Sequence, residues 1–144
     1  RALEVLALTG RSIVDYQQEH RFAERPYEVL KIGLTLERQR LDDRIDRRTE
    51  AMVEQGFVAE VQGLLARGYG GELKPMQSLG YRHMVAYLSG QGDLAQAVRL
   101  IQRDTRRYAR RQMSWFAADR EITWLAPDEV NAATEAVGRF FEHR

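Results

Sequence analysis

Hydrophobic residues recur with a helical period of about 3.6 residues along most of this chain. Together with Gly and cap residues at its breaks, the pattern predicts helices over residues 1–8, 12–18, 37–55, 57–66, 81–88, 93–119 and 128–143. Gly10 closes the first helix, and Ser12 with Asp15 is typical of a capping pair that opens the second. Runs rich in β-branched and aromatic residues predict two strands, over 27–36 and 121–125. Residues 68–78, with glycines and Pro75, predict a loop.

Two predicted strands are too few for a stable sheet of their own. We therefore expect both strands to join a sheet that further sequence completes. The first residues, RALEVLALTG, begin as a helix already under way and without an initiating Met. The sequence thus predicts a mostly helical part of a longer α/β protein.

The helix around TRRYARRQMSWF, residues 105–116, has the most informative pattern. Five of its arginines fall within an arc of roughly 140°, and they are Arg103, Arg106, Arg107, Arg110 and Arg111. Apolar residues such as Ile101 lie opposite, so the helix is expected to pack inward and to present guanidinium groups to phosphate. Thr105 and Gln112, in the apolar half, either form hydrogen bonds in the core or face a groove where a base is read. The aromatic residues expected in the core are Trp115, Phe116 and Trp124.

Composition limits what this arginine face implies. Of 22 basic residues only Lys31 and Lys74 are Lys, but the net charge is +1, so the whole molecule does not attract nucleic acid. A preference for Arg suits bidentate phosphate contacts, and a GC-rich genome explains it equally well. The chain has no Cys, which excludes disulfides and thiolate zinc sites. It also lacks an apolar run long enough to span a membrane.

In the predicted helix 37–55, an apolar stripe through Leu41, Ile45 and Met52 also contains Arg48. Burying an unpaired guanidinium costs several kcal/mol, so Arg48 is expected to be buried beside an anion. That anion is either a carboxylate from another helix or, with Arg44 one turn earlier, a bound phosphate or diphosphate. The acidic residues of this helix, expected to pair with neighbouring arginines or face solvent and not to bind a metal, are Asp42, Asp43 and Asp46.

The segment MQSLGYRHM, residues 76–84, leads from the loop into the next helix. Gly80 permits close backbone approach, and free N–H groups at a helix start bind anions. Tyr81 and Arg82 offer a stacking surface and a guanidinium suited to an unstacked RNA base. The structural alternative is a tight turn with Tyr81 buried.

No P-loop motif, nucleophile elbow or zinc motif occurs in the sequence.

Four separate blocks of the sequence, taken together in the order in which they occur, are more specific than any single motif. They are RALEVLALTGRS, LDDRIDRRTEAMVEQGFVAEVQGLLARG, MQSLGYRHMVAYLSG, and TRRYARRQMSWF followed by EITWL. In this order, from Arg1 to about Leu125, the chain resembles the C-terminal part of the bacterial tRNA dimethylallyltransferase family. The resemblance implies an α/β P-loop-type fold with an inserted helical tRNA-binding domain. This chain, residues 1–144, would supply the end of the helical region and then strands and helices of the core domain, without the N-terminal P-loop part.

The resemblance further implies transfer of a dimethylallyl group from dimethylallyl diphosphate to N6 of the adenosine 3′ to the anticodon, A37, with Mg²⁺. The ATP-type P-loop, the magnesium ligands and the general base would lie in the N-terminal part, so we expect no catalytic residue here and no activity from this chain alone. The implied partners are the tRNA anticodon stem-loop and dimethylallyl diphosphate, for a cytoplasmic monomer without membrane contact. The alternatives are a noncatalytic helical RNA-binding module and a structural domain whose arginines form only internal ion pairs.

By the same resemblance, Arg44 and Arg48 match a paired R-I-x-x-R pattern and are assigned to the diphosphate end of the reaction channel. The residues that the resemblance places against tRNA are Arg1, Gln77, Ser78, Leu79, Gly80, Tyr81, Arg82, Arg106, Arg110, Arg111, Gln112, Met113, Ser114, Trp115, Phe116 and Ala117. Arg110 and Ser114 stand where relatives often have Lys and Thr, so charge and hydroxyl are kept.

Overall fold

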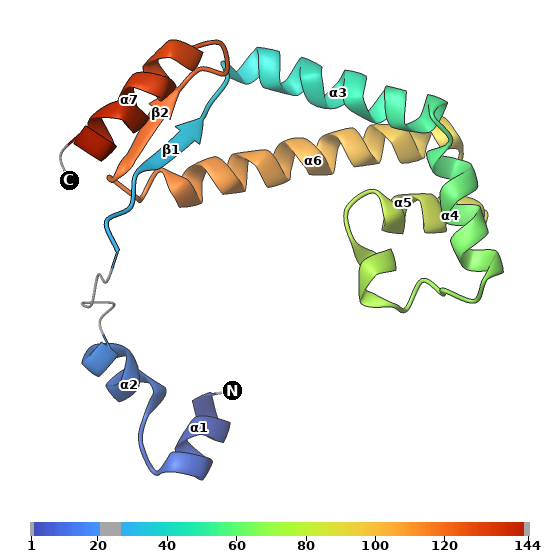
Figure 1. Ribbon diagram of the computed structural model, residues 1–144. Helices are drawn as coiled ribbons and strands as arrows, with labels where there is room; N and C mark the ends of the chain where they lie inside the picture. The colour runs from blue at the N-terminus through green and yellow to red at the C-terminus, as the bar shows by residue number, and fades with distance from the viewer. Residues whose placement is uncertain (1, 21–26, 143–144) are drawn as a thin grey trace. The chain divides into compact units, whose positions relative to one another are not determined.

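A computed structural model describes residues 2–20 and 27–142, and it divides into two compact units, Arg1–Lys31 and Ile32–Arg144 (Figure 1). The first unit contains the helices α1 (Ala2–Thr9) and α2 (Ile13–His20). The Gly10 N–H donates to the Leu6 carbonyl at 2.9 Å and closes α1. The Ser12 hydroxyl accepts from the Val14 N–H at 3.1 Å, and the Asp15 carboxylate accepts from the Ser12 N–H at 3.0 Å. Both helices and the predicted capping pair are thereby confirmed.

The second unit is built on two long helices that pack against each other, α3 (Arg38–Glu54) and α6 (Leu94–Phe116). The Glu37 carboxylate caps α3 by accepting from two main-chain N–H groups at 2.9 and 3.0 Å. The Asp93 carboxylate caps α6 in the same way, at 2.6 Å from the Gln96 nitrogen. Because side-chain caps satisfy the free N–H groups of a first turn, they fix where each helix begins. Both helices agree with the sequence prediction to within a few residues at each end.

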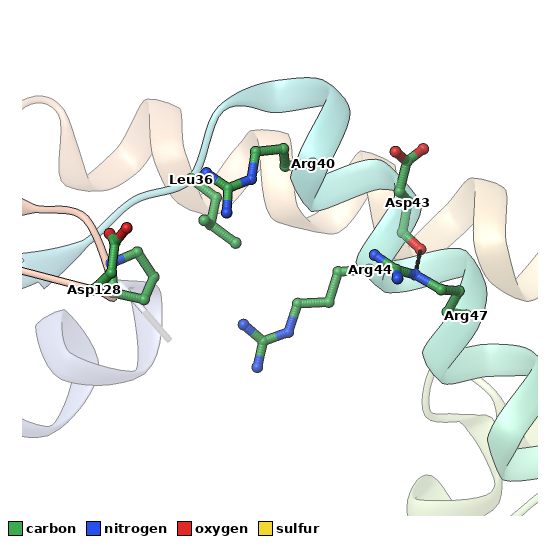
Figure 2. Close-up of a pocket in the computed structure, with 7 residues that line it drawn as sticks. Leu36, Arg40, Asp43, Arg44, Arg47 and Asp128 are labelled. Carbon is green, nitrogen blue, oxygen red and sulfur yellow. Dashed lines mark hydrogen bonds between the residues drawn. The ribbon is translucent and has the colours of Figure 1, made fainter.

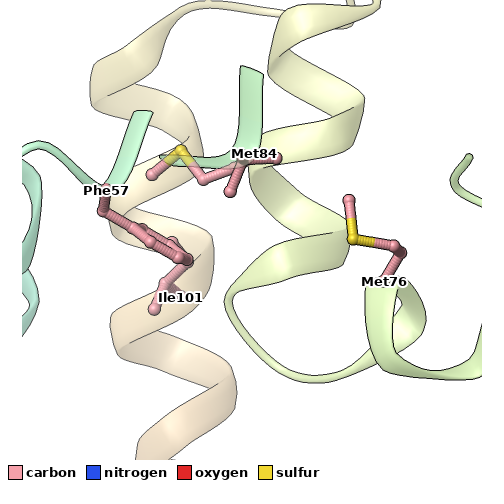
Figure 3. Packing of buried hydrophobic residues seen from close by; sticks show 5 residues of the cluster. Phe57, Met76, Met84 and Ile101 are labelled. Carbon is pink, nitrogen blue, oxygen red and sulfur yellow. The ribbon is translucent and has the colours of Figure 1, made fainter. Parts of the chain in front are cut away.

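The core of the second unit lies where α6 meets α4 (Phe57–Ala66) and α5 (Tyr81–Leu88). Its buried hydrophobic side chains, in part drawn in Figure 3, are Phe57, Val61, Met76, Met84 and Ile101. Removing each of these from water stabilises the fold by about 1.5–3 kcal/mol before the entropy of ordering is subtracted.

One core residue comes from the segment that the sequence predicted as a loop throughout. Within residues 68–78 the structure contains the short 3₁₀ helix η1 (Lys74–Gln77). Pro75 fits its first turn, where no N–H partner is needed, and Met76 is only 3 % exposed. Burial of Met76 therefore orders a segment whose Gly and Pro content alone suggests irregular structure.

The strands β1 (Lys31–Leu34) and β2 (Ile122–Leu125) form a two-stranded parallel sheet. Strand β1 is shorter than the predicted 27–36, because a strand extends only as far as its partner supplies hydrogen bonds and β2 has four residues. Gly33 allows close packing of the two strands, since a Cβ there would lie 2.7 Å from atoms of the Trp124 ring and of Ile122.

The helix α7 (Val130–Glu142) follows β2 and ends the described chain. The mostly helical α/β fold predicted from the sequence is thus confirmed. Among the described residues, none of the helices has the length and apolar character that a membrane crossing requires.

Candidate phosphate-binding and RNA-binding surfaces

An arginine-lined cavity of about 250 Å³ opens at the start of α3 (Figure 2). Leu36, just after β1, and Pro127, just after β2, both line it. The cavity therefore lies at the carboxyl ends of the parallel strands, the edge where ligands usually bind in open α/β sheets. Its remaining lining residues are Arg40, Asp43, Arg44, Arg47 and Asp128.

Guanidinium groups from two successive turns of α3 dominate this cavity. The Arg47 Nε donates to the main-chain carbonyl of Asp43 at 3.3 Å, and the Asp43 carboxylate accepts from the Gln39 amide at 3.1 Å. Within the described part of the chain, neither Arg40 nor Arg44 forms an ion pair with a carboxylate. Guanidinium groups without carboxylate partners are suited to hold a phosphate or diphosphate.

Arg44 and Arg48, the two arginines assigned to the diphosphate, have different surroundings in the structure. Arg44 lines the cavity, whereas Arg48 does not. The expectation that Arg48 is buried is wrong, because its side chain is exposed. The buried residues of α3 are instead Ile45 and Thr49, one turn apart, and the Thr49 hydroxyl donates to the Ile45 carbonyl at 2.9 Å. Because this hydrogen bond satisfies its hydroxyl, Thr49 can occupy the buried position next to Arg48. The Arg48 guanidinium faces solvent.

The turn 77–82 is held by local hydrogen bonds. The Gln77 amide donates to the Glu72 carbonyl at 3.1 Å, and the Ser78 hydroxyl donates to the Pro75 carbonyl at 2.6 Å. Leu79 is half-buried against the core. Gly80 has a φ of 94°, which residues with a side chain rarely adopt, and the chain enters α5 immediately after it.

Tyr81 belongs to the core as much as to the surface. Its ring meets Phe57 edge to face, with 5.2 Å between ring centroids and 89° between planes. Its hydroxyl donates to the Glu60 carboxylate, and this hydrogen bond is the main cause that raises the pKa of Tyr81. These contacts favour the packing alternative, and stacking of Tyr81 on a base stays a prediction.

Arg82 is exposed, but its guanidinium is bound to Asp104 of α6, with 2.8 Å between Nη2 and Oδ2. The same carboxylate accepts from the Arg103 Nε at 2.9 Å and lies 3.2 Å from the His83 Nε2. These hydrogen bonds, Arg103's first, hold the pKa of Asp104 well below its usual value. Asp104 is therefore a fully charged anchor between α5 and α6.

The arginines of α6 do not form one free surface. Arg106 pairs with Asp46 of α3 and is 27 % exposed, so it joins the two long helices instead of facing solvent. Arg110 and Arg111 are exposed, and neither has an ion-pair partner in the part of the chain that the structure describes. Of the three α6 arginines that the resemblance places against tRNA, Arg110 and Arg111 are therefore the two that are available to phosphate.

The end of α6 is more open than the sequence suggested. Trp115 is 74 % exposed and Phe116 is 38 % exposed, with their rings in edge-to-face contact. The expectation that both rings lie in the core is therefore wrong, whereas Trp124 in β2 is half-buried. No described element covers this end of α6 tightly enough to bury the two rings.

The other residues predicted to contact tRNA fall on the same stretch of α6. Gln112, Ser114 and Ala117 are exposed, and Met113 is half-buried. The Ser114 hydroxyl donates to the Arg110 carbonyl at 3.1 Å, within the helix. Thr105 satisfies its hydroxyl similarly, on the Ile101 carbonyl at 2.7 Å. Arg1 lies outside the described residues.

In residues 2–19 and 27–142, no three His, Asp or Glu side chains converge as metal ligands would. Asp43 and Asp128 do line the arginine cavity, but with three guanidinium groups beside them. Mg²⁺ binds oxygen ligands in an octahedron, and neighbouring cations oppose its binding. The described residues therefore do not fit a magnesium site.

Sequence reasoning missed Arg40 and Arg47 in the cavity and Asp104 beside the turn. A signal for Asp104 was present, because it is the one acidic residue of α6 and stands one and three residues from Arg103 and Arg107. No comparable signal marked Arg40, since its place in the cavity depends on where the chain after β2 returns.

Parallel strands with an arginine-lined cavity at their carboxyl ends are typical of α/β proteins that bind phosphate-bearing ligands. Comparison with known proteins identifies the particular group. The chain belongs to the IPP transferase family, whose model matches residues 1–119.

Two curated relatives show the extent of the similarity. The tRNA dimethylallyltransferase 2 of Syntrophus aciditrophicus is 56 % identical over 140 residues, which cover 97 % of this chain and 45 % of the relative. The protein of the same name from Geotalea uraniireducens is 51 % identical, covering 98 % of this chain and 46 % of the relative. The chain thus spans a little under half the length of the curated relatives it matches.

Two solved structures have the same fold over nearly all of the chain. The tRNA delta(2)-isopentenylpyrophosphate transferase of Staphylococcus epidermidis superposes with a TM-score of 0.76 at 27 % identity, covering 99 % of this chain and 47 % of that one. The full-length tRNA isopentenylpyrophosphate transferase of Bacillus halodurans gives 0.72 at 32 % identity, covering 91 % and 47 %.

Proposed function

We propose that this chain is the tRNA-contacting C-terminal part of an enzyme that transfers a dimethylallyl group from dimethylallyl diphosphate to N6 of the adenosine 3′ to the anticodon. The observation that carries the proposal is the 56 % identity, over 97 % of the chain, to a relative named tRNA dimethylallyltransferase. The positions of the exposed arginines on α6 and of the arginine-lined cavity support it.

The proposal divides the work along the polypeptide. Sequence preceding this chain would add strands to the two-stranded sheet and carry the P-loop-type site, the general base and the magnesium ligands. Coverage of only 45 % of the relative named above supports this division.

The arginine-lined cavity is proposed to hold the diphosphate. As the allylic carbon–oxygen bond breaks, the leaving diphosphate gathers negative charge. Guanidinium groups fixed in position stabilise this charge more than they stabilise the ground state, and this difference accelerates the reaction. Arg44 is the residue on which the family resemblance and the cavity agree, and Arg48 remains a second proposed contact outside it.

The turn 77–82 and the segment 110–117 are proposed to bind the anticodon stem-loop. The target adenosine must leave its stack to reach the reacting carbon, which costs a few kcal/mol. Phosphate contacts by Arg110 and Arg111, together with contacts from the turn, would offset this cost.

The test is prenyl transfer to tRNA, followed by mass spectrometry of the nucleosides. We expect the full-length protein to form N6-dimethylallyladenosine from dimethylallyl diphosphate, and a tRNA with guanosine at the target position to remain unmodified. The 144-residue chain alone is expected to give no product. Product from the chain alone would contradict the division of labour. Stem-loop binding without product by the full-length protein would instead favour the noncatalytic RNA-binding module.

A further inference from the structure

We propose that Asp104 is a positioning residue that assembles Arg82, Arg103 and Arg107 into one binding site for a tRNA backbone phosphate. The inference rests on the proposed function, because it takes the anticodon stem-loop as the ligand. It adds Asp104, Arg103 and Arg107 to the residues that the family resemblance places against tRNA.

The carboxylate of Asp104 is shared between two elements. Its Oδ2 lies 2.8 Å from Arg82 Nη2 and 3.2 Å from His83 Nε2, both on α5. Its Oδ1 lies 2.9 Å from Arg103 Nε and 3.8 Å from Arg107 Nη1, both on α6. The Asp104 side chain is 14 % exposed, whereas Arg82, Arg103 and Arg107 are 50 %, 49 % and 58 % exposed. A largely buried anion thus holds three guanidinium groups that solvent and ligands reach.

The charges of this cluster favour an anionic ligand. His83 is buried, and its desolvation lowers its pKa, so it is neutral near pH 7. One carboxylate then faces three guanidinium groups, which leaves an excess of positive charge. Each guanidinium has five N–H donors, and Asp104 occupies a minority of them. The remaining donors suit the oxygens of a phosphodiester, for which Arg is the preferred protein partner.

Asp104 orders the neighbouring arginine side chains before tRNA binds. A free Arg side chain samples many rotamers and loses this freedom when it binds, which weakens binding. Contacts to Asp104 restrict Arg82, Arg103 and Arg107 before tRNA arrives, and they bring the α5 arginine beside the two on α6. Preorganised groups bind more tightly because less entropy is lost on association.

The position of the cluster fits a nucleic-acid backbone better than an isolated anion. Arg107 is three and four residues before Arg110 and Arg111, so these side chains share a helix face. Arg110 and Arg111 have no ion-pair partner among the described residues. Positive groups therefore continue along α6 from the Asp104 cluster toward the segment 110–117, as a chain of phosphates requires.

The decisive variant is Asp104→Asn, tested for binding of an anticodon stem-loop by the full-length enzyme. If Asp104 only neutralises nearby arginines, removing its charge makes the surface more positive and tightens binding. If it positions them, binding weakens despite the added positive charge. We expect affinity about three- to tenfold lower. At saturating tRNA, kcat is expected to be unchanged, and so is the KM for dimethylallyl diphosphate. Asp104→Glu, which keeps the charge but moves it, is expected to weaken binding too.

Arg103→Gln and Arg107→Gln test the phosphate contacts themselves. Each is expected to weaken stem-loop binding about three- to tenfold and to reduce the slope of log K against log salt by about 0.7 to 0.9. The matched control is Arg99→Gln, which removes the same charge from an exposed position on α6 that has no ion pair in the described part of the chain. This control is expected to change affinity by less than about twofold.

Unchanged or tighter binding by Asp104→Asn, with a wild-type melting temperature, overturns the inference. So does an effect of Arg103→Gln and Arg107→Gln no larger than that of Arg99→Gln. If Asp104→Asn lowers the melting temperature, the two Arg→Gln variants at exposed positions still decide the outcome. Failure of the wild-type enzyme to bind the stem-loop or to prenylate tRNA would instead overturn the proposed function, and it is seen before any variant is made.

Discussion

At the scale of single residues, His83 is a buried polar side chain that carries a titratable ring. It is 9 % exposed, its Nε2 faces Asp104, and its Nδ1 has no hydrogen-bond partner. Burial is the main cause that lowers its pKa, and the neighbouring Arg82 and Arg103 lower it further, while Asp104 opposes them. Neutral His83 donates from Nε2 to Asp104, whereas the protonated form would place a second N–H at Nδ1 without an acceptor.

His83 should therefore make the fold less stable in mild acid. A folded-state pKa below the unfolded value of 6.5 means that the unfolded chain takes up the proton first. The stability that neutral His83 contributes is present above about pH 6.5 and is lost as the pH falls through the folded pKa. We expect His83→Gln to show a smaller decline in the free energy of unfolding between roughly pH 7 and pH 5, measured by urea denaturation. Identical pH profiles for the variant and the wild type would contradict this assignment.

A second residue-scale prediction separates Arg44 from Arg48. Both are exposed, so replacing either by Ala should change the free energy of unfolding by less than about 0.5 kcal/mol. Arg44 lines the cavity, and we expect Arg44→Ala to lower kcat/KM for dimethylallyl diphosphate by about 10²-fold. Arg48→Ala is the matched control from the same helix, with a smaller effect expected because Arg48 lies outside the cavity. A larger loss in Arg48→Ala would move the diphosphate away from the cavity.

At the scale of elements, the parallel strand pair depends on the close approach of β2 side chains to Gly33 of β1. Ile122 and Trp124 of β2 occupy the space that a side chain at Gly33 of β1 would need. The pair is short, with four residues in each strand, so it has little other packing to absorb a displacement. Loss of this packing would also disturb the chain that lines the cavity at Leu36 and Pro127.

We expect Gly33→Ala to destabilise the fold by about 1–3 kcal/mol, since the new Cβ overpacks the strand pair. The matched control is Gly63→Ala in α4, where a Cβ would meet nothing within 4 Å. Because Ala favours a helix over Gly, that control is expected to stabilise the fold by about 0.5–1 kcal/mol. Urea denaturation of both variants measures the two effects, and an unchanged midpoint for Gly33→Ala would show that the strands can separate without cost.

At the scale of the whole molecule, the sequence predicted the helices well and their contacts poorly. Caps such as Glu37 and Asp93 are local signals, so helix ends follow from neighbouring residues. The exposure of Arg48 and Trp115 depends on which neighbouring element covers each helix face, and periodicity alone does not carry this information. Asp104 illustrates the same limit, because its partners on α5 are about twenty residues away along the chain.

The pairing of Arg106 with Asp46 has a consequence for how this region can change in evolution. This ion pair fixes the rotation of α6 about its own axis relative to α3. Along α6, Arg106 lies between the Asp104 cluster and the two arginines Arg110 and Arg111. Inserting a single residue into α6 turns everything beyond it by about 100° around the helix axis, which would point Arg110 and Arg111 away from the Asp104 cluster. The length of α6 between Asp104 and Arg111 should thus be invariant among functional relatives.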